Sequence, residues 1–122
     1  MMMMTLEAET TSTLSTHVLD VALGRPARGI DATLERVTDD RMLIIGGGTT
    51  NAEGNITSLV TQTALAPGVY RLRFDSEGYF AATGRETFYP EIVIHFRVGA
   101  GIAQYHVQLL LSPFGYSTSW ER

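Results

Sequence analysis

Strict alternation of apolar and polar side chains is the feature that most limits what this chain can fold into. In the segment 69–75, Tyr70, Leu72 and Phe74 alternate with arginines and an aspartate. Residues 91–98 repeat the pattern, with isoleucine, phenylalanine and valine at every second position. Because successive side chains of a β-strand point to opposite faces of its sheet, each segment is predicted to be a strand buried on one face only.

Turn signals divide the rest of the chain into similar short segments, since glycine and proline interrupt regular structure more strongly than other residues. The stretch 24–26 is expected to be one turn, and the three glycines at 46–48 are expected to end the strand before them. We expect strands at residues 14–20, 31–37, 42–45, 58–60, 69–75, 91–98, 104–111 and 115–120.

Residues 76–83 form the one segment with the signals of a helix. Ser76 stands at the expected N-cap position and Gly84 just past the last turn. Arg85 and Glu86, immediately beyond, are expected to pair at the surface. With about eight short strands and one short helix, the chain is predicted to be all-β, a sandwich of two sheets.

Length and composition indicate one folded domain. The chain has 122 residues, of which 44% are hydrophobic and 18% charged, and these proportions are typical of a globular protein. We expect the domain to span residues 13–122 and residues 1–12 to be a disordered leader. That leader lacks the basic and apolar regions of a secretory signal, which favours a cytoplasmic location.

The net charge, the length of the apolar runs and the cysteine content argue against several classes of function. The net charge is −4 and the nine basic residues, all arginine, are scattered, so we expect no nucleic-acid partner. No apolar run approaches the roughly 20 residues that a membrane span needs, so we expect no membrane partner. The chain has no cysteine, and the spacing of its three histidines supports no metal site.

Two histidines are predicted to lie on the outer faces of their strands. His106 alternates with Tyr105 and Val107, whose series is predicted to face the core, and His17 has a similar position in the first strand. Imidazole exchanges protons near neutral pH, so both are candidate general acids or bases. The alternative for each is an ordinary surface histidine, and we assign His95 to that class.

Three stretches, in order along the chain, resemble one known family. "LSTHVLDVALGRPA" (14–27), "GVYRLRFDSEGYFAATGRETFYPEIVIHF" (68–96) and "YHVQLLLSPFGYST" (105–118) are similar to the transthyretin-related 5-hydroxyisourate hydrolases. The resemblance implies a transthyretin-like two-sheet sandwich that assembles as a homotetramer, a dimer of dimers. It also implies an enzyme without metal or cofactor, whose sites lie in a channel lined by the C-terminal strand.

The site of that family combines two histidines, an arginine after an Asp-Gly turn and a C-terminal Tyr-Arg-Gly-Ser. The resemblance implies that His17 and His106 are the catalytic histidines. Asn55 stands where the family has the arginine, and residues 119–122 replace the C-terminal tetrapeptide. The side chains expected to contact a small-molecule substrate are Asn55, Gln108, Leu110, Ser117, Ser119, Trp120, Glu121 and Arg122.

Three functions stay open on this evidence. The first is an enzyme with a repurposed site, in which the two histidines act on a small cyclic or heteroaromatic compound by hydrolysis, isomerisation or cyclisation. The second is an authentic 5-hydroxyisourate hydrolase of urate catabolism. The third is a small-molecule binder without catalysis, like transthyretin. The retained histidines favour an enzyme, and the lost arginine favours the first function over the second.

Overall fold

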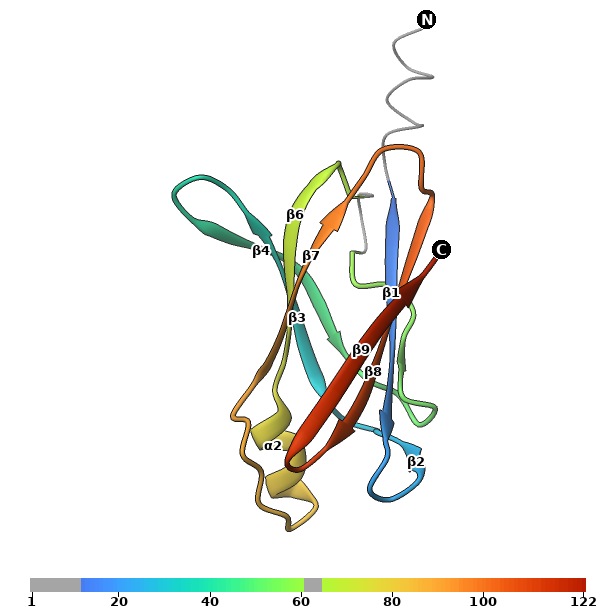
Figure 1. Ribbon diagram of the computed structural model, residues 1–122, viewed down its shortest axis with the longest axis vertical. Coiled ribbons are helices and arrows are strands. Elements are labelled where there is room, and N and C mark those ends of the chain that lie inside the picture. Colours follow the sequence, from blue (N-terminus) through green and yellow to red (C-terminus); the bar gives the residue numbers. More distant parts are fainter. Residues whose placement is uncertain (1–11, 61–64) are drawn as a thin grey trace, which may run out of the picture.

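The computed structural model describes residues 12–60 and 65–122 of the chain (Figure 1). In these residues it contains short strands and one short helix. Their bounds are β1 Thr13–Asp20, β2 Arg25–Pro26, β3 Asp31–Val37, β4 Met42–Thr49, β5 Asn55–Ile56, β6 Gly68–Phe74, α2 Ser76–Ala82, β7 Ile92–Val98, β8 Gln104–Ser112 and β9 Gly115–Glu121.

The strands form two sheets that lie face to face, seen edge-on in Figure 1. One sheet has the order β2-β1-β8-β9, with β5 also paired to β1, and the other has the order β4-β3-β6-β7. Strands β1 and β8 run parallel, although about 90 residues separate them, and the other neighbours run antiparallel. The prediction of an all-β, two-sheet sandwich with one short helix is confirmed.

The inner faces of both sheets supply the core, as the alternation predicts. Tyr70, Leu72 and Phe74 of β6 are at most 1% exposed. In the facing sheet, Val107 and Leu109 of β8 are at most 3% exposed, while the alternate residues His106, Gln108 and Leu110 are only partly buried. Burying one face of each sheet against the other is therefore the main source of stability.

The helix α2 lies where the sequence predicts it, but its cap is one residue earlier. The Asp75 carboxylate accepts a hydrogen bond from the Gly78 amide at 2.9 Å, so Asp75 is the N-cap. Ser76 is already helical, and its hydroxyl donates to the Tyr89 carbonyl at 2.7 Å. The prediction of Ser76 as the cap is wrong because a carboxylate one residue upstream reaches the same free amides.

The glycines at 46–48 lie inside β4 rather than ending it. A Cβ atom on Gly46 would lie 1.8 Å from the carbonyl oxygen of Leu59, so the missing side chain lets a second backbone segment cross the strand. Gly47 donates its amide hydrogen to that same oxygen at 3.0 Å. The prediction of a strand at 58–60 is wrong, and Asn55–Ile56 instead forms the short strand β5 against β1.

Two further expectations concern the ends of elements. The stretch 24–26 is not simply a turn, because Arg25–Pro26 forms the short strand β2 against the end of β1. Of the predicted leader, residues 1–11 lie outside the described residues. Ser12, its last residue, is buried and bridges to Leu65.

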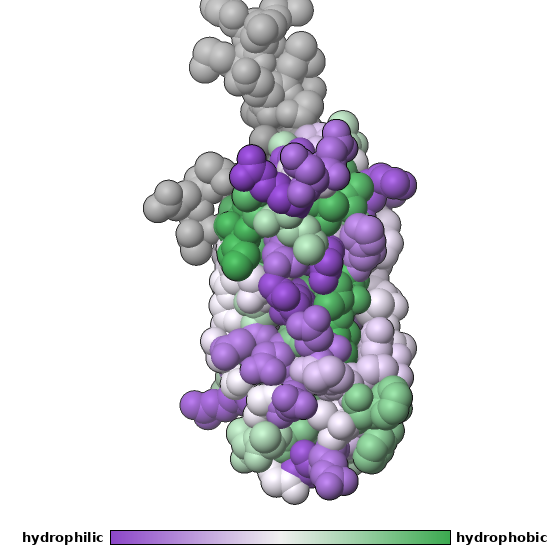
Figure 2. Space-filling view, turned by 90° about the vertical axis from the view of Figure 1, so that its left-hand side faces the viewer, coloured by the Kyte–Doolittle hydropathy of each residue, from purple (hydrophilic) through white to green (hydrophobic). Residues whose placement is uncertain are grey.

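The outer face of the four-stranded sheet is polar along its middle (Figure 2). Glu35 of β3 lies there between Arg71 and Arg73 of β6 and pairs with both arginines. In the described part of the chain, no helix has the length and apolar character of a membrane span.

Candidate active site

The outer face of the other sheet carries both candidate catalytic histidines. His17 of β1 lies beside Asn55 of β5 on one side and Gln108 of β8 on the other. Gln108 in turn lies opposite Ser119 of β9. Because these residues are in register, their side chains form one row that runs across four strands on the same face.

A second row lies two residues further along the strands. It consists of Ser15 of β1, His106 of β8 and Glu121 of β9, again in register. The Ser15 hydroxyl and His106 Nδ1 are 2.8 Å apart and share a hydrogen bond. The ring of His106 is thus held on one side by a neighbouring strand.

The two histidines lie close to each other within a single chain. His17 is in register with Gln108, so His106 is its diagonal neighbour on β8. With strands about 4.8 Å apart and a rise of about 3.3 Å per residue, the two Cα atoms are about 8 Å apart. Two imidazoles at that spacing can contact opposite sides of one small ring.

The remaining substrate-contact candidates fall into two groups. Leu110 and Ser117 form a third row on the same face, beyond Gln108. Trp120 lies on the opposite face of β9, where its ring contacts Tyr105 at a tilt of 32°, with the centroids 5.4 Å apart. The structure therefore brings Leu110 and Ser117 to the side of the imidazoles but turns the indole ring away from them.

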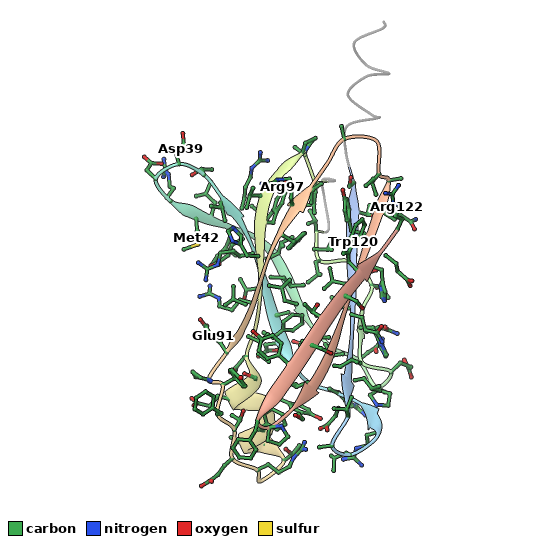
Figure 3. The ribbon with its side chains drawn as sticks, in the orientation of Figure 1. Asp39, Met42, Glu91, Arg97, Trp120 and Arg122 are labelled. Atoms are coloured by element: carbon green, nitrogen blue, oxygen red, sulfur yellow. The ribbon has the colours of Figure 1, made fainter. Side chains whose placement is uncertain are left out.

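Arg122 follows Glu121 at the end of the chain. Figure 3 labels Arg122 and Trp120 at the same end of β9, and the guanidinium carbon lies 5.9 Å from the centre of the indole ring. Arg122 also borders a polar hollow of about 310 Å³ that it shares with Ser15 and His106. Arg122 and His106 therefore border the same hollow.

Six residues that line that hollow were not among the predicted site residues. They are Thr13, Leu14, Ser15, Thr57, Gln104 and Tyr105. A sequence signal existed for Ser15, because it alternates with His17 and so shares its face. The same signal existed for Gln104, which alternates with His106 on β8, but none existed for Thr57, which only the tertiary structure brings to this hollow. A smaller hollow of about 30 Å³ lies beside it, lined by His106, Gln108, Ser119, Trp120 and Glu121.

A larger hollow, of about 380 Å³, lies at the edge between the two sheets. Its walls are mainly apolar and include Phe96 and the neighbouring rings of Tyr105 and Trp120. Its titratable groups, His95 and Arg97, are exposed side chains of β7. It suits an apolar contact, whereas the face with His17 offers acid and base groups.

A metal centre has no support in the described ranges, where no three histidine or carboxylate side chains come together in a way that could hold an ion. The side chains on the face with His17 and His106 offer hydrogen bonding and proton transfer.

A family model described as HIUase/Transthyretin family matches residues 14–119. The chain belongs to this family. A 5-hydroxyisourate hydrolase of Salmonella dublin is 41% identical over 105 residues, which cover 86% of this chain and 77% of the relative. Because the curated relatives that cover most of the chain are hydrolases, we class this member as a hydrolase-type enzyme.

Solved structures of the HIUase/transthyretin family have the same fold. Klebsiella pneumoniae 5-hydroxyisourate hydrolase superimposes with a TM-score of 0.81 at 33% identity, covering 91% of this chain and 99% of that one. Sea bream transthyretin in complex with thyroxine gives a TM-score of 0.80 at 31% identity, covering 88% and 93%. The family therefore includes a hydrolase and a ligand-binding protein on one sandwich.

This member of the HIUase/transthyretin family differs at the positions that the resemblance singled out. Asn55 completes the row of His17 where an arginine was expected, and the last strand ends in residues 119–122 instead of Tyr-Arg-Gly-Ser. The outer face thus keeps two imidazoles and surrounds them with mostly neutral hydrogen-bonding groups. Glu121 and Arg122 are its charged groups near the chain end.

Proposed function

We propose that the protein is a 5-hydroxyisourate-hydrolase-like enzyme whose site on the outer face of the β1–β8–β9 sheet has been modified for a small cyclic or heteroaromatic substrate. His17 and His106 act as general acid and base. The observation that carries the proposal is their placement on one face, two residues apart in register, on neighbouring parallel strands.

The side chains around the histidines support a binding role. Within residues 12–60 and 65–122, the side chains of His17, Gln108 and Ser119 form no hydrogen bond with the protein. They are half-buried or exposed, so their donors and acceptors are available to a ligand. Amide, hydroxyl and imidazole groups in adjacent rows suit a flat ring that carries carbonyl and N–H groups.

Hydrolysis on this face needs only the two imidazoles and water. One imidazole takes a proton from a water molecule as the water oxygen bonds to a ring carbonyl carbon. The other gives a proton to the ring nitrogen as the carbon–nitrogen bond breaks, which leaves a carboxylic acid and an amine. Isomerisation or cyclisation would use the same proton acceptor and donor.

The change at Asn55 favours a substrate other than 5-hydroxyisourate. An arginine presents two parallel N–H donors to an anion, and an asparagine cannot replace that charge or geometry. Losing one charge-assisted hydrogen bond costs about 1.5–3 kcal/mol. Arg122 lines the same hollow as His106, and its guanidinium supplies a cation that offsets part of this loss.

We also propose that the enzyme assembles as a homotetramer, a dimer of dimers, that encloses this face. The exposed position of the site in one chain supports it, since general acid–base catalysis benefits from excluding bulk water. Trp120, 53% exposed on the edge strand β9, is a further surface suited to burial between chains. Light scattering coupled to size-exclusion chromatography tests this, and a monomer at catalytic concentration would contradict it. The cytoplasmic location stays a prediction.

The decisive experiment follows the decay of freshly generated 5-hydroxyisourate with and without the protein. Decay far above the spontaneous rate identifies an authentic hydrolase of this compound. No acceleration, together with turnover of a related cyclic amide, supports the modified site. Saturable binding of aromatic ligands without turnover of either compound would contradict the enzyme and indicate a transthyretin-like binder.

A further inference from the structure

Ser15 contacts a catalytic candidate directly, although the resemblance gives it no role. Its hydroxyl oxygen lies 2.8 Å from Nδ1 of His106, across the parallel pairing of β1 and β8. This is the only hydrogen bond of either side chain to another described residue. Ser15 therefore determines which nitrogen of His106 remains for a substrate, and that nitrogen is Nε2.

The direction of this hydrogen bond depends on the tautomer of His106, because a serine hydroxyl can donate to Nδ1 or accept from it. A serine hydroxyl has one hydrogen to donate, and a neutral imidazole has one protonated and one unprotonated nitrogen. In the described part of the chain, Nδ1 is the only acceptor within reach of the Ser15 hydroxyl. When Ser15 donates, Nδ1 is the acceptor and the ring proton of neutral His106 resides on Nε2.

We propose that Ser15 is a positioning residue that holds neutral His106 in the form protonated on Nε2. His106 then presents an N–H group toward the substrate and serves as the acid, which leaves His17 to serve as the base. This division of roles rests on the proposed function, whereas the proposed tautomer of the ring rests on the contact between Ser15 and Nδ1.

Glu121 completes the arrangement on the opposite side of His106. The two residues are in register across the antiparallel pair β8–β9, and such side chains lie about 5 Å apart at Cβ. They also line the same small hollow. Among the described residues no hydrogen bond joins the two side chains, so Nε2 of His106 stays available to a substrate.

The experiment is nitrogen-15 NMR of the histidine side chains in the full-length protein, at about pH 8, where an ordinary imidazole is neutral. Couplings from the ring carbon protons distinguish a protonated Nε2 from a protonated Nδ1. We expect His106 to be protonated on Nε2 in the wild type and in Ser15→Thr, which keeps the hydroxyl. In Ser15→Ala the signal shifts toward a mixture of the two forms.

Ser58→Ala is the matched control, because Ser58 is exposed and its hydroxyl donates only to a nearby carbonyl. It should leave the His106 signals unchanged. A wild-type ring protonated on Nδ1, or the same ring state in Ser15→Ala as in the wild type, overturns the proposal. Neither outcome depends on a substrate, so a failure of this proposal can be separated from a failure of the proposed function.

Kinetics then tests the catalytic consequence. We expect Ser15→Ala to lower kcat/KM by roughly tenfold, since it removes one orienting hydrogen bond, and Ser15→Thr to restore most of it. The loss should appear in kcat more than in KM, because the ring still occupies its place. An altered ring state with unchanged kcat would show that His106 is not the acid.

Discussion

The strand β1 carries polar groups on both faces. Among the described residues, the groups on the inner face are hydrogen-bonded within the protein, whereas His17 on the outer face is not. On the inner face, the Thr16 hydroxyl donates to the Val107 carbonyl at 2.7 Å, and Asp20 is fully buried with three hydrogen-bond donors around it. On the outer face, His17 has no hydrogen bond to any described residue. Buried polar groups have to be satisfied by the protein, whereas exposed ones can be satisfied by a ligand.

The Asp20 cluster joins the helix region to the sheet. The Tyr79 hydroxyl and the Arg85 guanidinium donate to the same carboxylate oxygen at 2.7 and 2.6 Å, and the Leu23 amide donates to the other oxygen at 3.0 Å. The Arg85 guanidinium also lies over the Phe80 ring, 4.9 Å from its centre. The expected surface pair of Arg85 with Glu86 is wrong, because the buried carboxylate offers a stronger partner.

The pKa of Asp20 reflects this environment. Burial alone would raise it, but hydrogen bonds from Arg85, Tyr79 and the Leu23 amide, with the charge of Arg85, lower the pKa below the ordinary value of 3.8. Asp20 is therefore ionised and committed to stability. The difference between the two faces teaches that alternation alone can place groups that stabilise the fold on one face of a strand and groups available to a ligand on the other.

The largest effect should come from the outer face. Replacing His17 or His106 with alanine should lower kcat/KM by roughly 10²- to 10⁴-fold, the usual contribution of a general acid or base. The free energy of unfolding should change by less than about 0.5 kcal/mol, because neither side chain belongs to the core. His95→Ala, on the other sheet, is the control and should retain activity. If the alanine variants of His17 or His106 unfolded, the contrast between the outer and inner faces would be wrong.

The inner face should show the reverse behaviour. Arg85→Ala leaves the buried Asp20 carboxylate without its cation and should lower the free energy of unfolding by about 3 kcal/mol, measured in urea. The folded fraction should retain its kcat, because the cluster does not belong to the outer face. Glu86→Ala should change stability by about 0.5 kcal/mol or less. Equal effects of the two variants would show that the buried pair contributes little.

Asn55→Arg sharpens the assignment of the substrate. If the row of His17 binds 5-hydroxyisourate, the added guanidinium should raise kcat/KM for that compound by roughly 10- to 100-fold, equivalent to about 1.5–3 kcal/mol. Asn55→Lys supplies the charge without the paired donors, so its gain should be smaller. An unchanged rate for both variants would mean that the substrate does not reach this row.

The smallest effect is a pH dependence of stability. Because the pKa of Asp20 is lowered in the folded state, the stability from its ionised form is present above the unfolded value of 3.8 and is lost as the pH falls through the lower folded value. Asp20→Asn removes this part of the slope, which is at most about 1.4 kcal/mol per pH unit. Urea denaturation between about pH 5 and pH 2 measures it, and parallel curves for the two proteins would contradict it.

Local pattern was sufficient for much of the fold. Alternation assigned Tyr70 and Leu109 to the core and placed His17 and His106 on outer faces, because the side-chain period of a strand depends only on neighbouring residues. The same reasoning was wrong for the glycines at 46–48, which permit a close crossing by Leu59 instead of ending a strand. A glycine that allows a turn and a glycine that allows a close backbone approach cannot be distinguished from the sequence alone.

The sequence by itself determined the faces of the strands, the two-sheet class and the family, since each depends on short-range pattern or on motif order. Only the tertiary structure decided that Ser15 meets His106 and that Asp20 meets Arg85, contacts that join residues 91 and 65 positions apart. The physical reason is that alternation specifies which way a side chain points. It does not specify which strand lies beside it, in which direction or in which register.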